Sequence, residues 1–284
     1  MSIVVTGATG NLGHFVIEGL LERVPADQIT AVARSEEKAA GFAARGVKIA
    51  IADYNVPESF DGLFNAGDRV LLISSSEFDK GRVGQHEIAL DAAQAAGVAL
   101  FAYTSAPGAL TAALADDHRG TEAAILGSGL PYVLLRNGWY SEAYTEQMAP
   151  VLQYHTVIQA AGEGRVASAA RADYAAAAVA VLTGEGHENK TYELSGDTAW
   201  SLAEYAAELS KQTGEEIGYN AVSVEAYAGV LTGAGLPEPL AAMLAEVDAS
   251  IEKGELAGTS GELSRLIGRP TTPIADSIAV ALKG

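Results

Sequence analysis

Short apolar segments rich in β-branched residues alternate along this chain with longer, alanine-rich segments of helical pattern, and this alternation restricts the fold more than any other feature. The apolar segments are typical of parallel strands that helices cover on both faces. We predict strands over residues 3–6, 29–33, 47–51, 70–74, 99–103, 132–136 and 191–194, and helices that begin near Asn11, Glu36, Pro57, Gly84, Asp116 and Arg171. The chain is therefore predicted to be an α/β protein with a doubly wound parallel sheet.

After Asn137 the pattern changes, and from Trp200 onward helices dominate. Residues 137–142 form a segment rich in aromatic side chains, and helices are predicted over 142–152, 201–212, 224–234, 240–251 and 262–267. The length of 284 residues and the hydrophobic content of 49% suit one large domain or two lobes. We expect one domain formed by 1–136 with 155–195. A smaller, mostly helical C-terminal lobe, formed by 137–154 with 196–284, is expected to cover the carboxyl edge of the sheet.

The first predicted strand leads directly into three glycines spaced as Gly7-x-x-Gly10-x-x-Gly13, and a helix follows. The first glycine of such a loop allows a tight turn, the second lets the backbone approach a pyrophosphate, and the third lets the helix pack on the strand. The diphosphate lies at the helix N-terminus, where unpaired N–H groups favour anions. The loop Gly7-Ala8-Thr9-Gly10-Asn11-Leu12-Gly13 therefore predicts a Rossmann-type dinucleotide site; a purely structural turn is the alternative.

Polar residues at the ends of the next strands indicate which dinucleotide binds. Folds specific for NAD usually place Asp or Glu after the second strand, whereas Arg34 offers a guanidinium to a 2′-phosphate. We therefore predict NADPH, with an exposed arginine at the start of a helix as the alternative. Asp53 could accept the adenine amino group or cap its own loop. The run Ser74-Ser75-Ser76 is expected along the cofactor near the nicotinamide ribose, and a solvated serine loop is its alternative.

Composition excludes several other functions. The formal net charge of −18 disfavours nucleic acids and anionic membranes as partners. The absence of cysteine excludes disulfides, thiolate nucleophiles and cysteine-bound zinc, and the five histidines lack metal-ligand spacing, so no metal site is predicted. No apolar run reaches the ~20 residues that a bilayer requires, and the N-terminus lacks the basic region of a signal peptide. We expect a cytoplasmic protein without membrane insertion.

Further segments carry a resemblance to a known family. They are residues 5–13, 72–77, 102–105, 135–142 and 167–174. Through them the chain resembles, over its whole length, the NmrA-like branch of the atypical short-chain dehydrogenase/reductases. Within that branch it is similar to the bacterial NADPH:quinone oxidoreductases, with the triphenylmethane reductases as close relatives.

The resemblance implies an activity and further site residues. It implies an NADPH-dependent reductase that transfers a hydride to a quinone without flavin or metal. It also implies that residues 137–142 approach the nicotinamide and line the substrate mouth, and that Thr104 and Arg171 belong to the same site. Alternatively, Trp139 and Tyr140 pack beneath the second lobe, and Arg171 caps its own loop or pairs with Asp173. The six residues of the loop are Asn137, Gly138, Trp139, Tyr140, Ser141 and Glu142.

One motif of the superfamily is missing. No tyrosine has a lysine four residues later, and His118 lies where the resemblance implies the lysine of relatives, so alcohol–ketone exchange is disfavoured. Reduction of a quinone tolerates this loss because it mainly requires donor and acceptor to be held in register. Tyr140 and Ser74 are candidate donors to the developing oxyanion, and His118 is a candidate proton donor or a structural histidine.

Two other functions are open. The first is reduction of triphenylmethane dyes or other planar electrophiles at the same site. The second is a redox sensor that binds NADP(H), acts on a partner protein and turns over no substrate. The sequence is also compatible with a homodimer.

Overall fold

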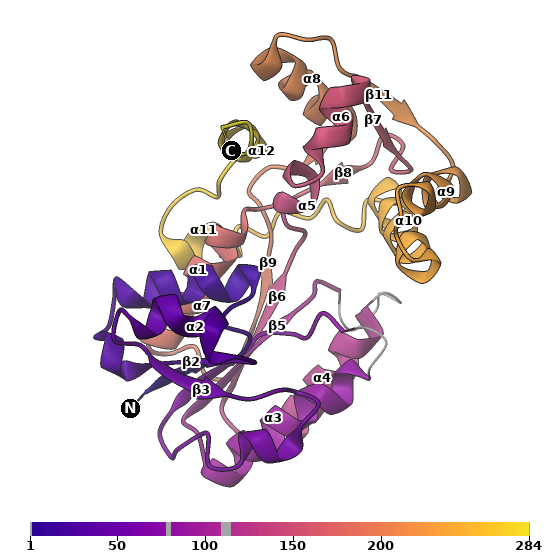
Figure 1. The fold of residues 1–284 in the computed structure, drawn as a ribbon. Helices are drawn as coiled ribbons and strands as arrows, with labels where there is room; N and C mark the ends of the chain where they lie inside the picture. Colours follow the sequence, from indigo (N-terminus) through magenta and orange to yellow (C-terminus); the bar gives the residue numbers. More distant parts are fainter. Residues whose placement is uncertain (1, 78–80, 109–114, 284) are drawn as a thin grey trace. The chain divides into compact units, whose positions relative to one another are not determined.

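The computed structural model describes residues 2–77, 81–108 and 115–283, which fold into two compact units (Figure 1). The first unit contains Met1–Asn137, Arg171–Leu194 and Arg265–Gly268, and the second contains Gly138–Ala170, Ser195–Ser264 and Arg269–Gly284. Segment 155–170, which we expected in the first unit, is therefore grouped with the second.

A seven-stranded parallel sheet forms the centre of the first unit, and it confirms the predicted α/β fold. Its order is β3-β2-β1-β4-β5-β6-β9. The chain runs outward from β1 to β3 and then returns to β4 beside β1, so the winding reverses at β1 and β4. Ligands of such sheets bind at the carboxyl ends of the strands at this reversal. The strands are β1 (Ile3–Val5), β2 (Ile29–Ala33), β3 (Lys48–Ile51), β4 (Arg69–Leu72), β5 (Leu100–Ser105), β6 (Tyr132–Asn137) and β9 (Lys190–Leu194).

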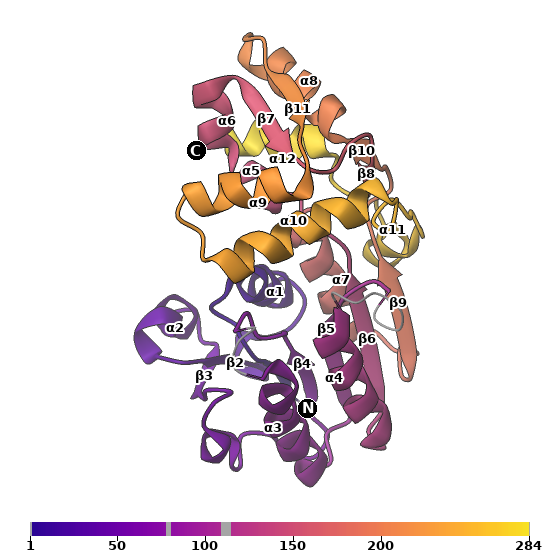
Figure 2. The ribbon, with the colours of Figure 1, turned by 90° about the vertical axis from the view of Figure 1, so that its right-hand side faces the viewer.

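Helices cover both faces of this sheet (Figure 2). On one face α1 (Asn11–Leu21) packs against α7 (Arg171–Thr183), and on the other α3 (Arg82–Ala96) packs against α4 (Asp116–Gly127). Helix α2 (Glu36–Ala43) connects β2 to β3 and contacts both. The short 3-10 helix η1 (Ala26–Gln28) precedes β2. The helix predicted near Pro57 is a second 3-10 helix, η2 (Pro57–Phe60).

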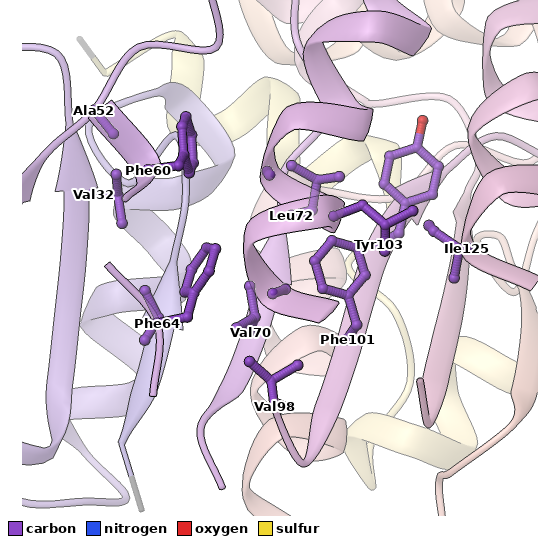
Figure 3. Close-up of a cluster of buried hydrophobic side chains, with 14 of the residues drawn as sticks. Val32, Ala52, Phe60, Phe64, Val70, Leu72, Val98, Phe101, Tyr103 and Ile125 are labelled. Carbon is purple, nitrogen blue, oxygen red and sulfur yellow. The ribbon is translucent and has the colours of Figure 1, made fainter. Parts of the chain in front are cut away.

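Alternate residues of the strands build the core beneath α3 and α4 (Figure 3). Val70 and Leu72 of β4 and Phe101 and Tyr103 of β5 face the same side, as the two-residue period of a strand requires. Burial of each large apolar side chain stabilises the fold by about 1.5–3 kcal/mol. The ring of Tyr103 belongs to this core, and its hydroxyl carries the hydrogen bonds described below.

The second unit combines helices with two short pairs of strands. Strand β7 (Thr156–Gln159) pairs in parallel with β11 (Gly218–Ala221), and β8 (Arg165–Val166) pairs with β10 (Trp200–Ser201) in the antiparallel direction. These strands were not predicted. They explain why segment 155–170 belongs here, because its strands find partners only after residue 195. The helices are α5 (Glu142–Thr145), α6 (Met148–Tyr154), α8 (Leu202–Thr213), α9 (Val224–Gly233), α10 (Glu238–Glu252) and α12 (Ile274–Ala281).

The prediction of one helix over 142–152 was wrong, because the segment forms α5 and α6. Pro150 lies in the first turn of α6, where a proline is tolerated. A continuous helix from 142 would place a full turn before Pro150, and the proline ring would then clash with the carbonyl group four residues earlier. Helix α11 (Glu262–Ile267) begins in the second unit and ends in the first. Among the helices of the described residues, none has both the length and the apolar character of a membrane span.

Candidate dinucleotide site

The glycine loop connects β1 to α1 at the reversal of the sheet. Gly7 adopts a φ of +61°, which favours glycine. A Cβ on Gly13 would lie 2.7 Å from the Cα of Ala8 and closer still to the carbonyl oxygen of Gly7. The N-cap of α1 is Gly10, which has no side chain to accept hydrogen bonds from the first turn, and that turn carries no acidic residue. The loop thus presents an uncapped helix N-terminus, which fits a diphosphate.

Thr6 and Tyr54 hold the strand ends around this loop. The Tyr54 hydroxyl donates to the Ile73 carbonyl at 2.8 Å and lies 2.5 Å from the Thr6 hydroxyl. The Ile73 amide donates to the Thr6 hydroxyl at 3.1 Å. The ring of Tyr54 stacks on Phe60 with centroids 5.9 Å apart. These contacts join the carboxyl ends of β1 and β4 to the loop after β3. They therefore fix the backbone around the surface that would bind the cofactor.

Arg34 and Asp53, predicted to bind the adenosine end, lie in a hydrogen-bonded network. An Arg34 nitrogen lies 3.2 Å from a Glu77 oxygen. One oxygen of Asp53 accepts from the Asn55 amide at 2.8 Å and from its side chain at 3.0 Å, so Asp53 caps its own loop. Ser35 caps α2 by accepting from the Lys38 amide. Arg34 itself is exposed and lies at the carboxyl end of β2.

The backbone of the serine segment after β4 is held by hydrogen bonds to side chains and not by pairing with another strand. The Ser74 amide donates to the Thr104 hydroxyl at 2.9 Å, and the Ser75 amide donates to Nε2 of His86 at 2.9 Å. Ser75 and Thr104 are buried, whereas Ser76 is exposed. The backbone of segment 74–76 therefore has a fixed conformation at the carboxyl end of β4. A segment that lines a ligand needs such a fixed conformation.

His118 is held between Tyr103 and Arg82. Its Nδ1 lies 2.8 Å from the Tyr103 hydroxyl, and its Nε2 lies 3.4 Å from an Arg82 nitrogen. Arginine only donates, so Nε2 accepts and Nδ1 carries the proton that it donates to Tyr103. Burial, and then the charge of Arg82, lower the pKa of His118 to about 4. The imidazole is thus neutral near pH 7 with both nitrogens engaged, which favours the structural alternative for this residue.

The buried His86 and the half-buried His118 should make the stability of the first unit depend on pH. Burial, followed by the charge of Arg82, lowers the pKa of His86 from 6.5 to about 3. His86 and His118 both stay neutral in the folded protein, so their contribution is fully present above pH 6.5. It is lost as the pH falls toward 4, because only the unfolded chain takes up the protons. Between pH 6 and pH 5 the free energy of unfolding should fall by about 1 kcal/mol for each histidine.

Urea denaturation of the His86→Gln variant at the two pH values tests this dependence. The decrease between pH 6 and pH 5 should be about 1 kcal/mol smaller than in the wild type. His14→Gln, which removes an exposed histidine, is the matched control. An unchanged decrease in the His86→Gln variant would contradict the assignment.

A buried ion pair supports the carboxyl ends of β5 and β6. Two nitrogens of Arg136 donate to the two oxygens of Glu122 at 2.9 and 2.6 Å, and a third donates to Glu193 at 2.7 Å. Ser105 donates to Glu122 at 2.5 Å. The Glu122 side chain is only 2% exposed. This pair holds β6 immediately before Asn137.

Asn137 ends β6 with a buried oxygen that no group of residues 2–77, 81–108 or 115–283 satisfies. The residue is 7% exposed, and its Oδ1 has no hydrogen-bond partner in the part of the chain that the structure describes. A buried carbonyl oxygen without a partner costs free energy unless a ligand supplies a donor. Together with the uncapped N-terminus of α1, this atom shows that the residues fit a dinucleotide.

The other residues of the predicted loop belong to the second unit. Tyr140 forms a β-bridge with Ala169, and the Ser141 amide donates to the Ala169 carbonyl at 2.9 Å. The Ser141 hydroxyl lies 2.9 Å from that of Ser168. Trp139 packs against the core of the second unit. The backbone of segment 139–141 is therefore anchored within its own unit. Gly138 precedes this segment, and Glu142 begins α5.

The structure adds residues that the sequence motifs did not indicate. Four further side chains contact segments at the carboxyl ends of the strands: Tyr54, Asn55, Gln85 and His86. Gln85 and His86 lie in the first turns of α3, the next helix after β4, and this place in the order of elements is the sequence feature that could have indicated them. Arg171 begins α7 in the first unit. Within the described residues, no three His, Asp or Glu side chains are grouped as metal ligands.

The fold and the loop define a dinucleotide-binding protein, and a family model agrees. The model described as NAD(P)H-binding matches residues 7–185, a stretch that begins at the first glycine of the loop. This is well over half of the chain. The chain therefore belongs to the NAD(P)H-binding family.

Two curated relatives are similar over nearly the whole chain. Quinone oxidoreductase 2 of Escherichia coli K12 is 48% identical over 279 residues, which cover 98% of this chain and 97% of the relative. The NAD(P)H azoreductase of Xenophilus azovorans is 30% identical, with 96% of each chain covered.

Solved structures show the same similarity. The crystal structure of the NADPH-dependent quinone oxidoreductase of Escherichia coli in complex with NADPH matches with a TM-score of 0.95 and 47% identity, covering 99% of each chain. The triphenylmethane reductase of Citrobacter matches with a TM-score of 0.95 and 40% identity over 100% of both chains. These similarities confirm the resemblance inferred from the motifs.

Proposed function

We propose that this protein is a reductase that transfers a hydride from NADPH to a quinone without flavin or metal. The observation that carries the proposal is the uncapped, glycine-lined N-terminus of α1 at the reversal of the sheet, beside Arg34 at the end of β2. The similarity to an NADPH-dependent quinone oxidoreductase supports the choice of cofactor and of acceptor.

Each part of the site has a binding role in this proposal. The amides of Asn11, Leu12 and Gly13 hold the diphosphate, and the Arg34 guanidinium holds the 2′-phosphate. Asp53 accepts from the adenine amino group with the oxygen that does not cap its loop. The Ser74–Ser76 segment and Thr104 line the nicotinamide ribose, and Oδ1 of Asn137 accepts a hydrogen bond from the nicotinamide end. When bound, NADPH supplies the hydride from C4 of its nicotinamide.

The protein's contribution to the chemical step is mainly positioning. His118 is neutral and engaged on both nitrogens, so it is poorly placed to deliver a proton. The hydroxyl of Ser74, in the first unit, is the donor to the developing oxyanion in this proposal, and water protonates the product. Holding donor and acceptor in register can supply several kcal/mol of the barrier reduction, which suits an acceptor as electrophilic as a quinone.

A second candidate is the reduction of cationic dyes. The 40% identity to a triphenylmethane reductase over the full length of both chains favours it, and the two activities would use the same cofactor site.

Cofactor oxidation with purified protein tests the function. The loss of reduced-nicotinamide absorbance is followed with NADPH and NADH in parallel, with a soluble benzoquinone or a triphenylmethane dye and without added flavin. Oxidation of NADPH that requires the quinone supports the proposal. Tight NADPH binding without oxidation by any quinone or dye would overturn it in favour of a sensor.

Charge reversal at Arg34 tests the cofactor assignment. Arg34→Asp removes hydrogen bonds to a charged group and adds a like charge beside the 2′-phosphate, so the Kd for NADPH should rise about 10- to 150-fold. NADH lacks that phosphate, and its Kd should change by less than about threefold. Fluorescence titration of the reduced nicotinamide measures both constants. An equal loss of affinity for the two cofactors would show that Arg34 does not bind the 2′-phosphate.

A further inference from the structure

A carboxylate lies beside the guanidinium assigned to the 2′-phosphate. Glu77 follows β4 in the chain, yet its oxygen lies 3.2 Å from a nitrogen of Arg34 at the end of β2. Only β1 separates β2 from β4 in the sheet, so their carboxyl ends are close. The Arg34 side chain is 64% exposed and that of Glu77 is 25% exposed. The guanidinium that would bind NADPH therefore already has an anionic partner.

Two amide side chains hold Glu77 in place from the other side. Its second carboxylate oxygen accepts from the side chains of Asn55 at 3.0 Å and Gln85 at 3.1 Å. Gln85 also donates to the Asn55 oxygen at 2.9 Å and is only 4% exposed. The Glu77 amide donates to the Ser75 hydroxyl at 3.1 Å. Because these bonds anchor both ends of the residue, Glu77 cannot leave the neighbourhood of Arg34 without breaking them.

We propose that Glu77 sets the cofactor selectivity of this site by weakening the preference for NADPH over NADH. The proposal rests on the cofactor site described under the proposed function. The carboxylate shares Arg34 with the 2′-phosphate and repels it as a like charge. The same carboxylate can accept a hydrogen bond from the ribose hydroxyl of NADH. Folds specific for NAD use an acidic residue after the second strand for this purpose, and here the segment after β4 supplies it.

The sign of the effect follows from the relative sizes of two opposing contributions. An exposed ion pair such as Arg34–Glu77 contributes little to holding the arginine in place. Repulsion between a carboxylate and a phosphate that share one guanidinium is larger, because the phosphate carries nearly two charges at close range. Removing the charge of Glu77 should therefore tighten NADPH binding about three- to tenfold.

The Glu77→Gln variant tests this selectivity because it removes the charge and keeps the size of the side chain. The Kd values for NADPH and NADH are measured by fluorescence titration at low salt. NADPH should bind about three- to tenfold more tightly than to the wild type, and NADH equally or more weakly. The gain should shrink at high ionic strength, as an electrostatic effect does and a packing effect does not.

Asp91→Asn is the matched control, since it removes one negative charge from an exposed position on the same helix as Gln85. It should change both Kd values equally. An unchanged or lower NADPH selectivity in the Glu77→Gln variant, or the same gain in the Asp91→Asn variant, would overturn the inference. A wild-type protein that binds neither cofactor would instead overturn the proposed function itself.

Discussion

The Arg136→Met variant should lose about 3–5 kcal/mol of the free energy of unfolding. In the wild type, Arg136 donates two hydrogen bonds to Glu122, whose side chain is 2% exposed. Methionine fills much of the space but leaves the carboxylate buried with the Ser105 hydroxyl as its remaining described partner. An uncompensated buried charge costs far more than the intact pair contributes, and this asymmetry makes the expected loss large.

Urea denaturation, followed by far-ultraviolet circular dichroism, measures the loss. Arg45→Met is the matched control, because it breaks the surface ion pair of Arg45 with Glu18 in the same unit. Exposed pairs contribute about 0–1 kcal/mol, so the control should stay close to the wild type. Equal losses in the two variants would show that the burial of Glu122 does not determine the effect.

Replacing Gly13 by alanine should weaken NADPH binding about 10- to 150-fold, the loss expected when a hydrogen bond to a charged group, worth about 1.5–3 kcal/mol, is broken. The added Cβ would meet backbone atoms of Gly7 and Ala8, and the nearest atoms of Ala8 lie at 2.7 and 2.8 Å. Backbone cannot rotate away as a side chain can. The first turn of α1 and the loop must therefore move apart, which displaces the amides that would hold the diphosphate.

Gly41→Ala is the control for this substitution. Gly41 lies in the interior of α2, and a Cβ there would have no atom within 4 Å. Alanine should raise the free energy of unfolding by about 0.5–1 kcal/mol and leave the Kd for NADPH unchanged. A Gly13→Ala variant that binds NADPH as well as Gly41→Ala does would contradict the role of close packing in the loop.

The parallel sheet and the glycine loop could be read from the sequence because both depend on local features. Strands covered on both faces are apolar along their whole length, and each of the seven predicted strands occurs. The loop is defined by three glycines within seven residues; Gly7 needs a positive φ and Gly13 leaves no room for a Cβ. The short strands β7, β8, β10 and β11 lack such signals, because two to four residues show no periodicity and their stability comes from the partner strand.

The surroundings of the predicted side chains were decided by the tertiary structure. The sequence indicated Arg34 but not the Glu77 carboxylate beside it, 43 residues later in the chain. Likewise, it indicated His118 as a candidate proton donor, whereas burial between Tyr103 and Arg82 keeps its imidazole neutral. Local patterns determine which residues form strands, helices and turns. The pairing, burial and charge of a side chain depend on segments that only the packed sheet brings together, and these properties control its chemistry.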